Sequence, residues 1–141
     1  MKRQDIREHL FRLLFRLEFN EPSEMEEQLS LYFDSDADEE DSISYQIPKR
    51  DREYITEKFQ RIRGQLSELD SIIASSARGW ELERMGKVEL TILRLATYEV
   101  LFDEDIPVGV AIDQAVELAK KYGQEESSAF VNGVLANIAR T

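Results

Sequence analysis

The chain has 141 residues, a net charge of −11 and no cysteine. This length suits one domain with a sizeable core, and the lack of cysteine excludes a disulfide framework and a thiolate metal site. No apolar run approaches the ~20 residues of a membrane span, and the first residues lack the continuous apolar segment of a signal peptide. We therefore expect a cytoplasmic protein without membrane contact.

The acidic charge is concentrated in one segment. Residues 21–47 carry ten acidic and no basic side chains, whereas residues 1–20 have a net charge of +2 and residues 48–141 a net charge of −3. A strongly negative total argues against nucleic-acid binding, but most of the chain outside this segment is close to balanced. The charge distribution therefore leaves nucleic-acid binding open.

A first helix is predicted over about residues 3–19. It is apolar over most of its circumference, which indicates that other helices surround it. Its polar strip holds five charged side chains: Arg3, Arg7, Glu8, Arg12 and Arg16. The strip either contacts phosphates or is a solvated face with Glu8 and Arg12 as an i,i+4 pair, and the strip alone favours the second. His9, the only histidine, is expected at the surface or at a boundary rather than as a metal ligand or acid–base group.

Two further helices are predicted before residue 67. Ser23 and Glu26 have the spacing of a capping box, which starts a short helix over about residues 23–32. Pro48 opens a helix over about residues 49–66, and Gly64 weakens its end.

The segment DSDADEEDS at residues 34–42 separates these two helices. Its charges repel one another and it has nothing apolar to bury, so a mobile loop is expected. It lacks the central glycine and terminal glutamate of an EF-hand, so no calcium site is predicted.

A helix capped by Ser67 is predicted to end near residues 75–76, and the longest helix is predicted over about residues 83–102. Trp80, the only tryptophan, lies between these helices and is expected as a buried anchor.

The remaining stretch predicts two short apolar helices joined by a tight turn. Pro107 occupies the first position of one helix, and Gly123 stops it. The second helix starts at about residues 125–127. Gly133 in this helix is interpreted as permitting close helix approach. The turn brings polar side chains to a helix end and a helix start, which is either a ligand or nucleic-acid edge or a set of solvated caps.

No segment shows the period-2 alternation of a strand, so we predict an all-α fold of about seven helices in two small packed bundles. These form a single domain over residues 1–141, with an N-terminal half over about 1–66, including the acidic loop at 34–47, and a C-terminal half over about 67–141. The sequence has no Gly-rich phosphate loop, no GxSxG and no HExxH. We therefore expect no enzyme, no catalytic residue, no cofactor and no metal site.

Several segments resemble the NusB family of transcription antitermination factors. They are WELERM at residues 80–85, ELTILRLATYEVL at 89–101, IPVGVAIDQAVELAKKYG at 106–123 and FVNGVL at 130–135. The resemblance covers about residues 49–139 and extends more loosely to the first helix. It implies an all-helical fold of two small bundles without catalysis. It also implies a factor that binds the boxA element of nascent RNA together with the small-subunit ribosomal protein also called NusE, and acts on RNA polymerase, chiefly at ribosomal RNA operons.

The resemblance further implies which residues contact RNA: Lys2, Arg3, Arg7, Lys121, Tyr122, Glu126, Ser127 and Phe130. Because boxA RNA is single-stranded, aromatic side chains can stack on its bases while lysine and arginine meet its phosphates. Phe130 also belongs to an apolar face, so core packing is an alternative for it. Glu99 is a weaker candidate for the face that binds the partner protein.

Two sequence features bear on the strength of RNA binding. Gln4 and Asp5 interrupt the N-terminal basic cluster, so we expect weak binding by the isolated protein and reliance on the partner. As a hypothesis, the acidic segment competes electrostatically with RNA. Removing residues 34–41 should then raise RNA affinity at low salt, and unchanged affinity would reject the idea.

Two alternatives belong to other functional classes. A NusB-like domain also forms the N-terminal part of certain rRNA cytosine methyltransferases, which would need a methyl-donor domain that these residues do not include. The second alternative is a helical protein-binding adaptor that does not bind RNA. Salt-dependent RNA binding distinguishes the antitermination factor from this adaptor. A homodimer is left open, because apolar helix faces can also pair chains.

Overall fold

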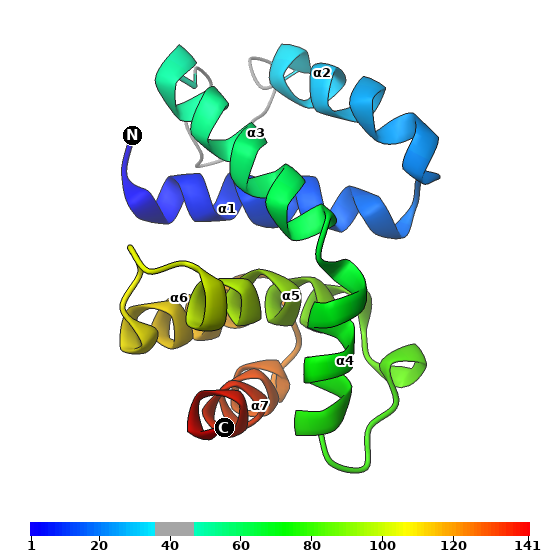
Figure 1. Ribbon diagram of the computed structural model, residues 1–141, viewed down its shortest axis with the longest axis vertical. Helices are drawn as coiled ribbons and strands as arrows, with labels where there is room; N and C mark the ends of the chain where they lie inside the picture. The colour runs from blue at the N-terminus through cyan, green and yellow to red at the C-terminus, as the bar shows by residue number, and fades with distance from the viewer. Residues whose placement is uncertain (36–46) are drawn as a thin grey trace. The chain divides into compact units, whose positions relative to one another are not determined.

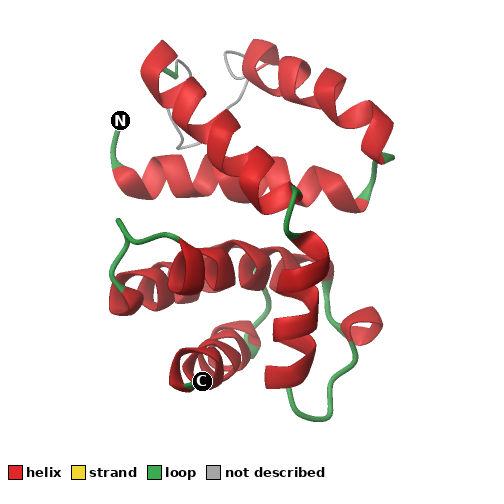
Figure 2. Ribbon diagram, viewed as in Figure 1, coloured by secondary structure: helices red, strands yellow, loops and turns green. Residues whose placement is uncertain are grey.

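The computed structural model describes residues 1–35 and 47–141, which form seven α-helices and no strand (Figures 1 and 2). The helices are α1 (Arg3–Phe15), α2 (Met25–Ser35), α3 (Lys49–Arg63), α4 (Leu66–Ser76), α5 (Lys87–Phe102), α6 (Val108–Tyr122) and α7 (Ser127–Arg140). The predicted all-α fold is confirmed. Most of the acidic segment, and with it the hypothesis that it competes with RNA, lies outside the described residues. No helix in the described ranges is both long enough and apolar enough to cross a membrane.

The chain divides into two compact units, residues 1–63 and 64–141. The boundary falls where α3 ends at Arg63, which is earlier than the predicted end near residue 66. Gly64 follows directly, and glycine is a poor helix former because its backbone loses the most conformational freedom on ordering.

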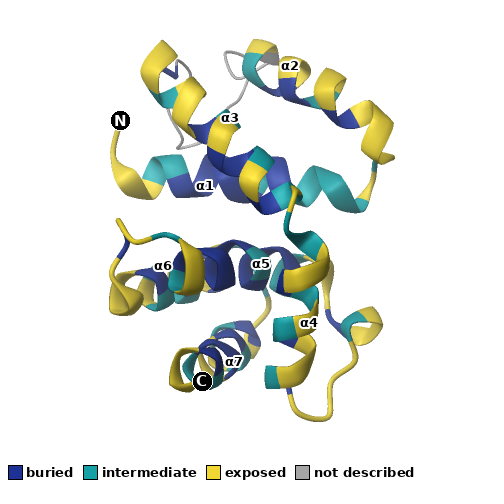
Figure 3. Ribbon diagram, viewed as in Figure 1, coloured by how far each residue is buried: buried dark blue, intermediate teal, exposed yellow. Residues whose placement is uncertain are grey.

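The first unit is built on α1 and α3, which pack against each other. Ile55, Phe59 and Ile62 on α3 are fully buried at the i, i+4, i+7 spacing of one helical face, and Leu13 on α1 is equally buried. The opposite side of α3 is exposed, whereas α1 has exposed residues only at its start (Figure 3). The amphipathic pattern of the sequence therefore accounts for the core of this unit.

His9 lies in this core and is only 2% exposed. Its Nδ1 is 2.5 Å from the hydroxyl of Tyr32 on α2, and the two rings meet edge to face with centroids 5.7 Å apart. The guanidinium of Arg16 lies over the Tyr32 ring, 5.1 Å from its centroid. The expectation of a surface or boundary histidine was wrong, because Tyr32 from a helix more than twenty residues later covers it.

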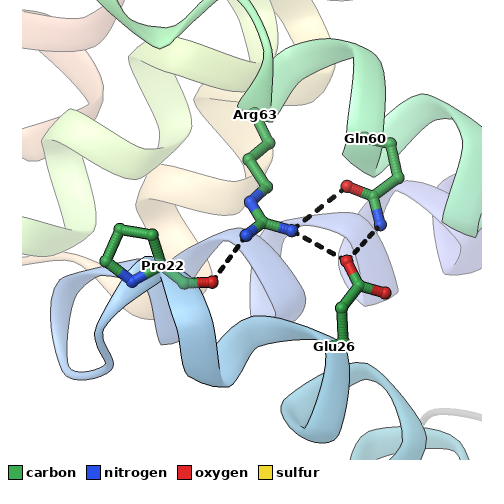
Figure 4. A network of polar contacts seen from close by, with 4 residues as sticks. All are labelled: Pro22, Glu26, Gln60 and Arg63. Carbon is green, nitrogen blue, oxygen red and sulfur yellow. Dashed lines mark hydrogen bonds and ion pairs between the residues drawn. The ribbon is translucent and has the colours of Figure 1, made fainter.

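Arg63 ties the end of α3 to the start of α2 (Figure 4). Its guanidinium donates to the Pro22 carbonyl oxygen at 2.6 Å, to Glu26 Oε1 at 3.0 Å and to Gln60 Oε1 at 3.3 Å. Gln60 also donates to Glu26 Oε1, at 3.2 Å. Four residues from α3, α2 and the turn before α2 therefore share one network.

The capping box at this place differs from the predicted one. It is formed by Glu21 and Glu24, with the Glu21 backbone N–H donating to Glu24 Oε1 at 2.8 Å. Pro22 starts a 3₁₀ turn (Pro22–Glu24) immediately before α2. The box predicted at Ser23 and Glu26 was therefore wrong, since the helical turn begins earlier and Glu26 is engaged by Arg63.

In the second unit, α5 contacts α4, α6 and α7, and α7 also contacts α4 and α6. Ala111, Ala115 and Ala119 on α6 are buried and spaced by four residues, so one narrow face of α6 can approach its neighbours closely. Arg94 on α5 donates two hydrogen bonds of 2.8 Å to the two carboxylate oxygens of Asp70 on α4. This fork fixes α4 against α5.

Two glycines of this unit differ in role. A side chain at Gly123 would begin 2.6 Å from Ser127 Oγ and 2.7 Å from the Ala119 carbonyl oxygen, and α6 ends directly before it, as predicted. Gly133 is exposed, and nothing lies within 4 Å of where its Cβ would be. The interpretation of Gly133 as a close-approach residue was therefore wrong.

Two predicted helix starts are shifted by a residue or two. Pro107 is the N-cap of α6 rather than its first helical residue. Gln65, not Ser67, is the N-cap of α4, which begins at Leu66.

Candidate nucleic-acid interface

The turn between α6 and α7 is held by Ser127, the first residue of α7. Its Oγ accepts a hydrogen bond of 2.8 Å from the Gln124 backbone N–H, and its hydroxyl donates to Glu89 Oε2. Ser127 is only 6% exposed. Ser127 therefore mainly holds the α6–α7 connection against the first helical turn of α5.

A hollow of about 370 Å³ lies beside Ser127. We call it the Trp80 hollow, and it is lined by Trp80, Arg84, Met85, Gly86, Glu89, Gln124, Glu126, Ser127 and Phe130. The rings of Trp80 and Phe130 meet edge to face, with centroids 5.5 Å apart and planes at 64°. The volume and the mixture of aromatic and polar lining are those of a small-ligand site.

Trp80 is 53% exposed, so the prediction of a buried anchor was wrong. It stands on a turn after α4, where its backbone N–H donates to the Ala77 carbonyl oxygen at 3.0 Å. Gly79 precedes it with a φ of +79°, a left-handed conformation that favours glycine. The Gly79-Trp80 pair was the available sequence signal, since side chains on tight turns are usually at the surface.

Three of the RNA residues implied by the resemblance line this hollow: Glu126, Ser127 and Phe130. Glu126 is exposed as the N-cap of α7, and Phe130 is half-buried one turn into that helix. Glu89, the half-buried carboxylate at this site, was not singled out from the sequence, because its proximity to Ser127 depends on how α5 and α7 pack.

Lys121 and Tyr122 occupy the last turn of α6 and do not line the hollow. Lys121 is exposed, with its Nζ 5.4 Å from the centroid of the half-buried Tyr122 ring. A cation beside an aromatic ring presents both a charge for phosphate and a surface for stacking.

The other three implied RNA residues lie in the first unit. Lys2 and Arg3 are exposed at the start of α1. Arg7, one turn further along, is only 5% exposed. Lys2 and Arg3 therefore present charge to solvent, whereas Arg7 presents very little.

Glu99, the candidate for partner binding, lies on α5 and is 1% exposed. It offers almost no carboxylate surface to another protein. Among residues 1–35 and 47–141, no group of three or more His, Asp or Glu side chains is arranged to hold a metal ion.

The described residues thus form an all-helical protein with aromatic, basic and acidic side chains gathered at the turn between α6 and α7. The chain belongs to the NusB family, whose model matches residues 4–140. It is 51% identical over 138 residues to the transcription antitermination protein NusB of Lachnoclostridium phytofermentans, and the match covers 98% of each chain.

Two solved structures are also similar over nearly the whole chain. NusB of T. maritima is 36% identical with a TM-score of 0.85, and the match covers 99% of this chain and 92% of that one. A crystal structure of antitermination factors NusB and NusE in complex with dsRNA is 27% identical with a TM-score of 0.78, covering 98% and 96%. The resemblance stated from the sequence is confirmed.

Proposed function

We propose that this protein is a transcription antitermination factor that binds boxA RNA together with NusE, and that this pair acts on RNA polymerase, chiefly at ribosomal RNA operons. The observation that carries the proposal is the full-length match to an antitermination protein at 51% identity. The similarity to a NusB–NusE complex that holds RNA supports both partners. No catalytic step is part of this function, and its place is the cytoplasm, where the polymerase works.

We further propose the following RNA contacts, given for each unit by itself. In the first unit, Lys2 and Arg3 meet phosphates, and the largely buried Arg7 supports the start of α1. In the second unit, Lys121 and Tyr122 bind the backbone and a base, while Glu126, Ser127 and Phe130 form the adjoining edge. Exposure supports the roles of Lys2, Arg3 and Lys121, because a phosphate contact needs an accessible cation.

The partner protein supplies part of the affinity in this proposal. The net charge of −11 repels a polyanion at long range, so the isolated protein binds RNA weakly. A second RNA-contacting protein on the same complex raises the effective concentration of the RNA at the first. Glu99 contributes to partner binding only through the packing of α5, because its own carboxylate is buried.

The two alternative functions are weighed by the same observations. The methyltransferase alternative is disfavoured, because this chain matches 98% of the length of a relative that is itself an antitermination protein. The adaptor alternative keeps NusE binding and drops RNA binding, so it is decided by experiment.

Fluorescence anisotropy of a labelled boxA RNA tests the proposal, with a scrambled RNA of the same composition as control. Each RNA is titrated with this protein alone and then with NusE present. We expect a preference for boxA that becomes much stronger with NusE. Binding to NusE with neither RNA bound would replace the proposal with the adaptor, and binding to neither NusE nor boxA RNA would reject the function.

A further inference from the structure

We propose that the Trp80 hollow holds one unpaired RNA base and that it selects guanine. The inference rests on the proposed RNA-binding function and adds two residues, Trp80 and Glu89, to the RNA contacts. Trp80 is the stacking surface, and Glu89 reads the edge of the base.

The stacking surface follows from the two rings at the hollow. In an edge-to-face pair, one ring points its edge at a face of the other ring. The partner covers neither face of the first ring and only one face of the second. Trp80 is 53% exposed, so part of its indole is open to a ligand. Stacking on an aromatic side chain is the commonest way in which a protein holds an unpaired base.

The hydrogen-bonding group is the carboxylate of Glu89. Its Oε2 accepts the hydroxyl hydrogen of Ser127, which fixes the side chain. Its Oε1 lies over Gly86, where a Cβ would be only 2.1 Å away, so glycine at this position leaves the oxygen room. Gly86, Glu89 and Ser127 all line the hollow. A fixed carboxylate is therefore available to a ligand that donates hydrogen bonds.

Guanine is the base that matches a carboxylate best. Its N1–H and N2–H are adjacent donors on one edge, whereas a carboxylate is acceptor-only with two oxygens. Adenine and cytosine place one amino group beside a ring nitrogen that accepts. Uracil places its single N3–H between two carbonyl oxygens, which a carboxylate repels. The expected order is guanine first and uracil last.

A basic side chain from a protein partner is the competing occupant, because a cation also suits aromatic rings and carboxylates. Arg84 lines the same hollow and would repel a second guanidinium, whereas Glu89 and Glu126 would attract it. Charge therefore does not decide between the two occupants. Glu126, Ser127 and Phe130, which the hollow shares with the proposed RNA edge, make it continuous with that edge. This continuity favours a base.

The fluorescence of Trp80 provides the test, because it is the only tryptophan in the chain. The probes are three eight-nucleotide RNAs: oligouridylate, the same RNA with one central guanosine, and the same RNA with one central inosine. Inosine stacks like guanosine but lacks the 2-amino group. Each RNA is titrated against the full chain while Trp80 fluorescence and RNA anisotropy are recorded together.

We expect the guanosine RNA to quench Trp80 and to bind roughly tenfold more tightly than the inosine RNA, since one hydrogen bond to a charged acceptor is lost. Trp80→Ala should weaken guanosine RNA binding by roughly tenfold, the cost of one stacked base. Trp80→Phe keeps a stacking ring and should lose little. Glu89→Gln, which can still accept from Ser127, should remove most of the preference for guanosine over inosine.

Phe102→Ala is the matched control. Phe102 is another partly exposed aromatic residue of the same unit, at the far end of α5, roughly 20 Å along the helix from Glu89. This variant should bind all three RNAs like the unmodified chain. An equal loss in Phe102→Ala and Trp80→Ala would overturn the assignment of Trp80.

The remaining outcomes separate this inference from the proposed function. boxA RNA binding without any change in Trp80 fluorescence would overturn the inference and leave the function standing. A fluorescence change on adding NusE alone, measured against Trp80→Phe as blank, with none on adding RNA, would assign the hollow to a side chain of the partner. Failure of boxA RNA to bind even with NusE would overturn the function and the inference together.

Discussion

Ser127, the first residue of α7, donates its hydroxyl hydrogen to Oε2 of Glu89 in the first turn of α5, 38 residues earlier in the chain. The same Oγ accepts the backbone N–H of Gln124. The Ser127 side chain therefore connects the starts of α5 and α7. The helix dipole favours a carboxylate such as that of Glu89 at a helix start. The same contacts fix the turn that carries the candidate RNA edge.

Replacing Ser127 with alanine should lower the free energy of unfolding by about 1–2 kcal/mol. The Gln124 N–H loses its acceptor and Glu89 loses its donor. Urea denaturation followed by circular dichroism measures the change. Ser128→Ala, at the next position and half-buried, is the control. If both variants lose the same stability, the hydroxyl of Ser127 has no special role.

Gly133 and Gly123 should respond to alanine in opposite directions. Gly133→Ala should raise the free energy of unfolding by about 0.5–1 kcal/mol, because alanine is the better helix former and its methyl group meets nothing. Gly123→Ala should lower it, because the new Cβ meets Ser127 and the Ala119 carbonyl oxygen. Thermal denaturation of the two variants gives the signs. Destabilisation by Gly133→Ala would mean that this position packs more closely than the structure indicates.

Arg63→Met should loosen the start of α2 in the first unit. The variant keeps the apolar stem but loses the hydrogen bonds to Pro22 and Glu26 (Figure 4), at a cost of about 1 kcal/mol because Glu26 is mostly exposed. Amide hydrogen exchange over residues 22–29 should speed up in the same variant. Arg61→Met is the matched control, since the ion pair of Arg61 with Glu57 is long, at 3.9 Å, and exposed. Unchanged exchange in Arg63→Met would contradict the role of the network.

Lys121→Gln should weaken RNA binding and make it less sensitive to salt. Loss of one phosphate contact to single-stranded RNA reduces the slope of log K against log salt by about 0.7. Lys120→Gln is the control, because Lys120 is a neighbouring exposed lysine that pairs with Glu117 at 3.7 Å. Titrations of boxA RNA at several salt concentrations, with NusE present, give both slopes. Equal slopes for the two variants would remove Lys121 from the phosphate contacts.

Most of the helices were predictable from the sequence because their apolar residues recur with a helical period. Ile55, Phe59 and Ile62 illustrate this, since their spacing alone places them on one buried face. Helix ends were less predictable, as Ser23 and Ser67 show. A serine before an apolar run satisfies the local rule for a cap, but the helical turns begin at Pro22 and directly after Gln65.

The candidate site was predictable only in part. The residues from Lys121 to Phe130 adjoin one another in sequence, so their gathering at one turn follows from the chain itself. Glu89 and Trp80 reach the same place through the packing of α5 and through the turn at Gly79, and no local pattern encodes either contact. His9 is a similar case, because its burial depends on Tyr32 in another helix.

Native mass spectrometry of this protein mixed with NusE and a boxA RNA tests the central claim most directly, since it counts the components of each complex. We predict one dominant complex with one copy of each component, which disappears when a scrambled RNA replaces boxA. A complex with NusE that takes up no boxA RNA, or that takes up boxA and scrambled RNA equally, would contradict the account. A homodimer that persists in the presence of both partners would contradict it as well.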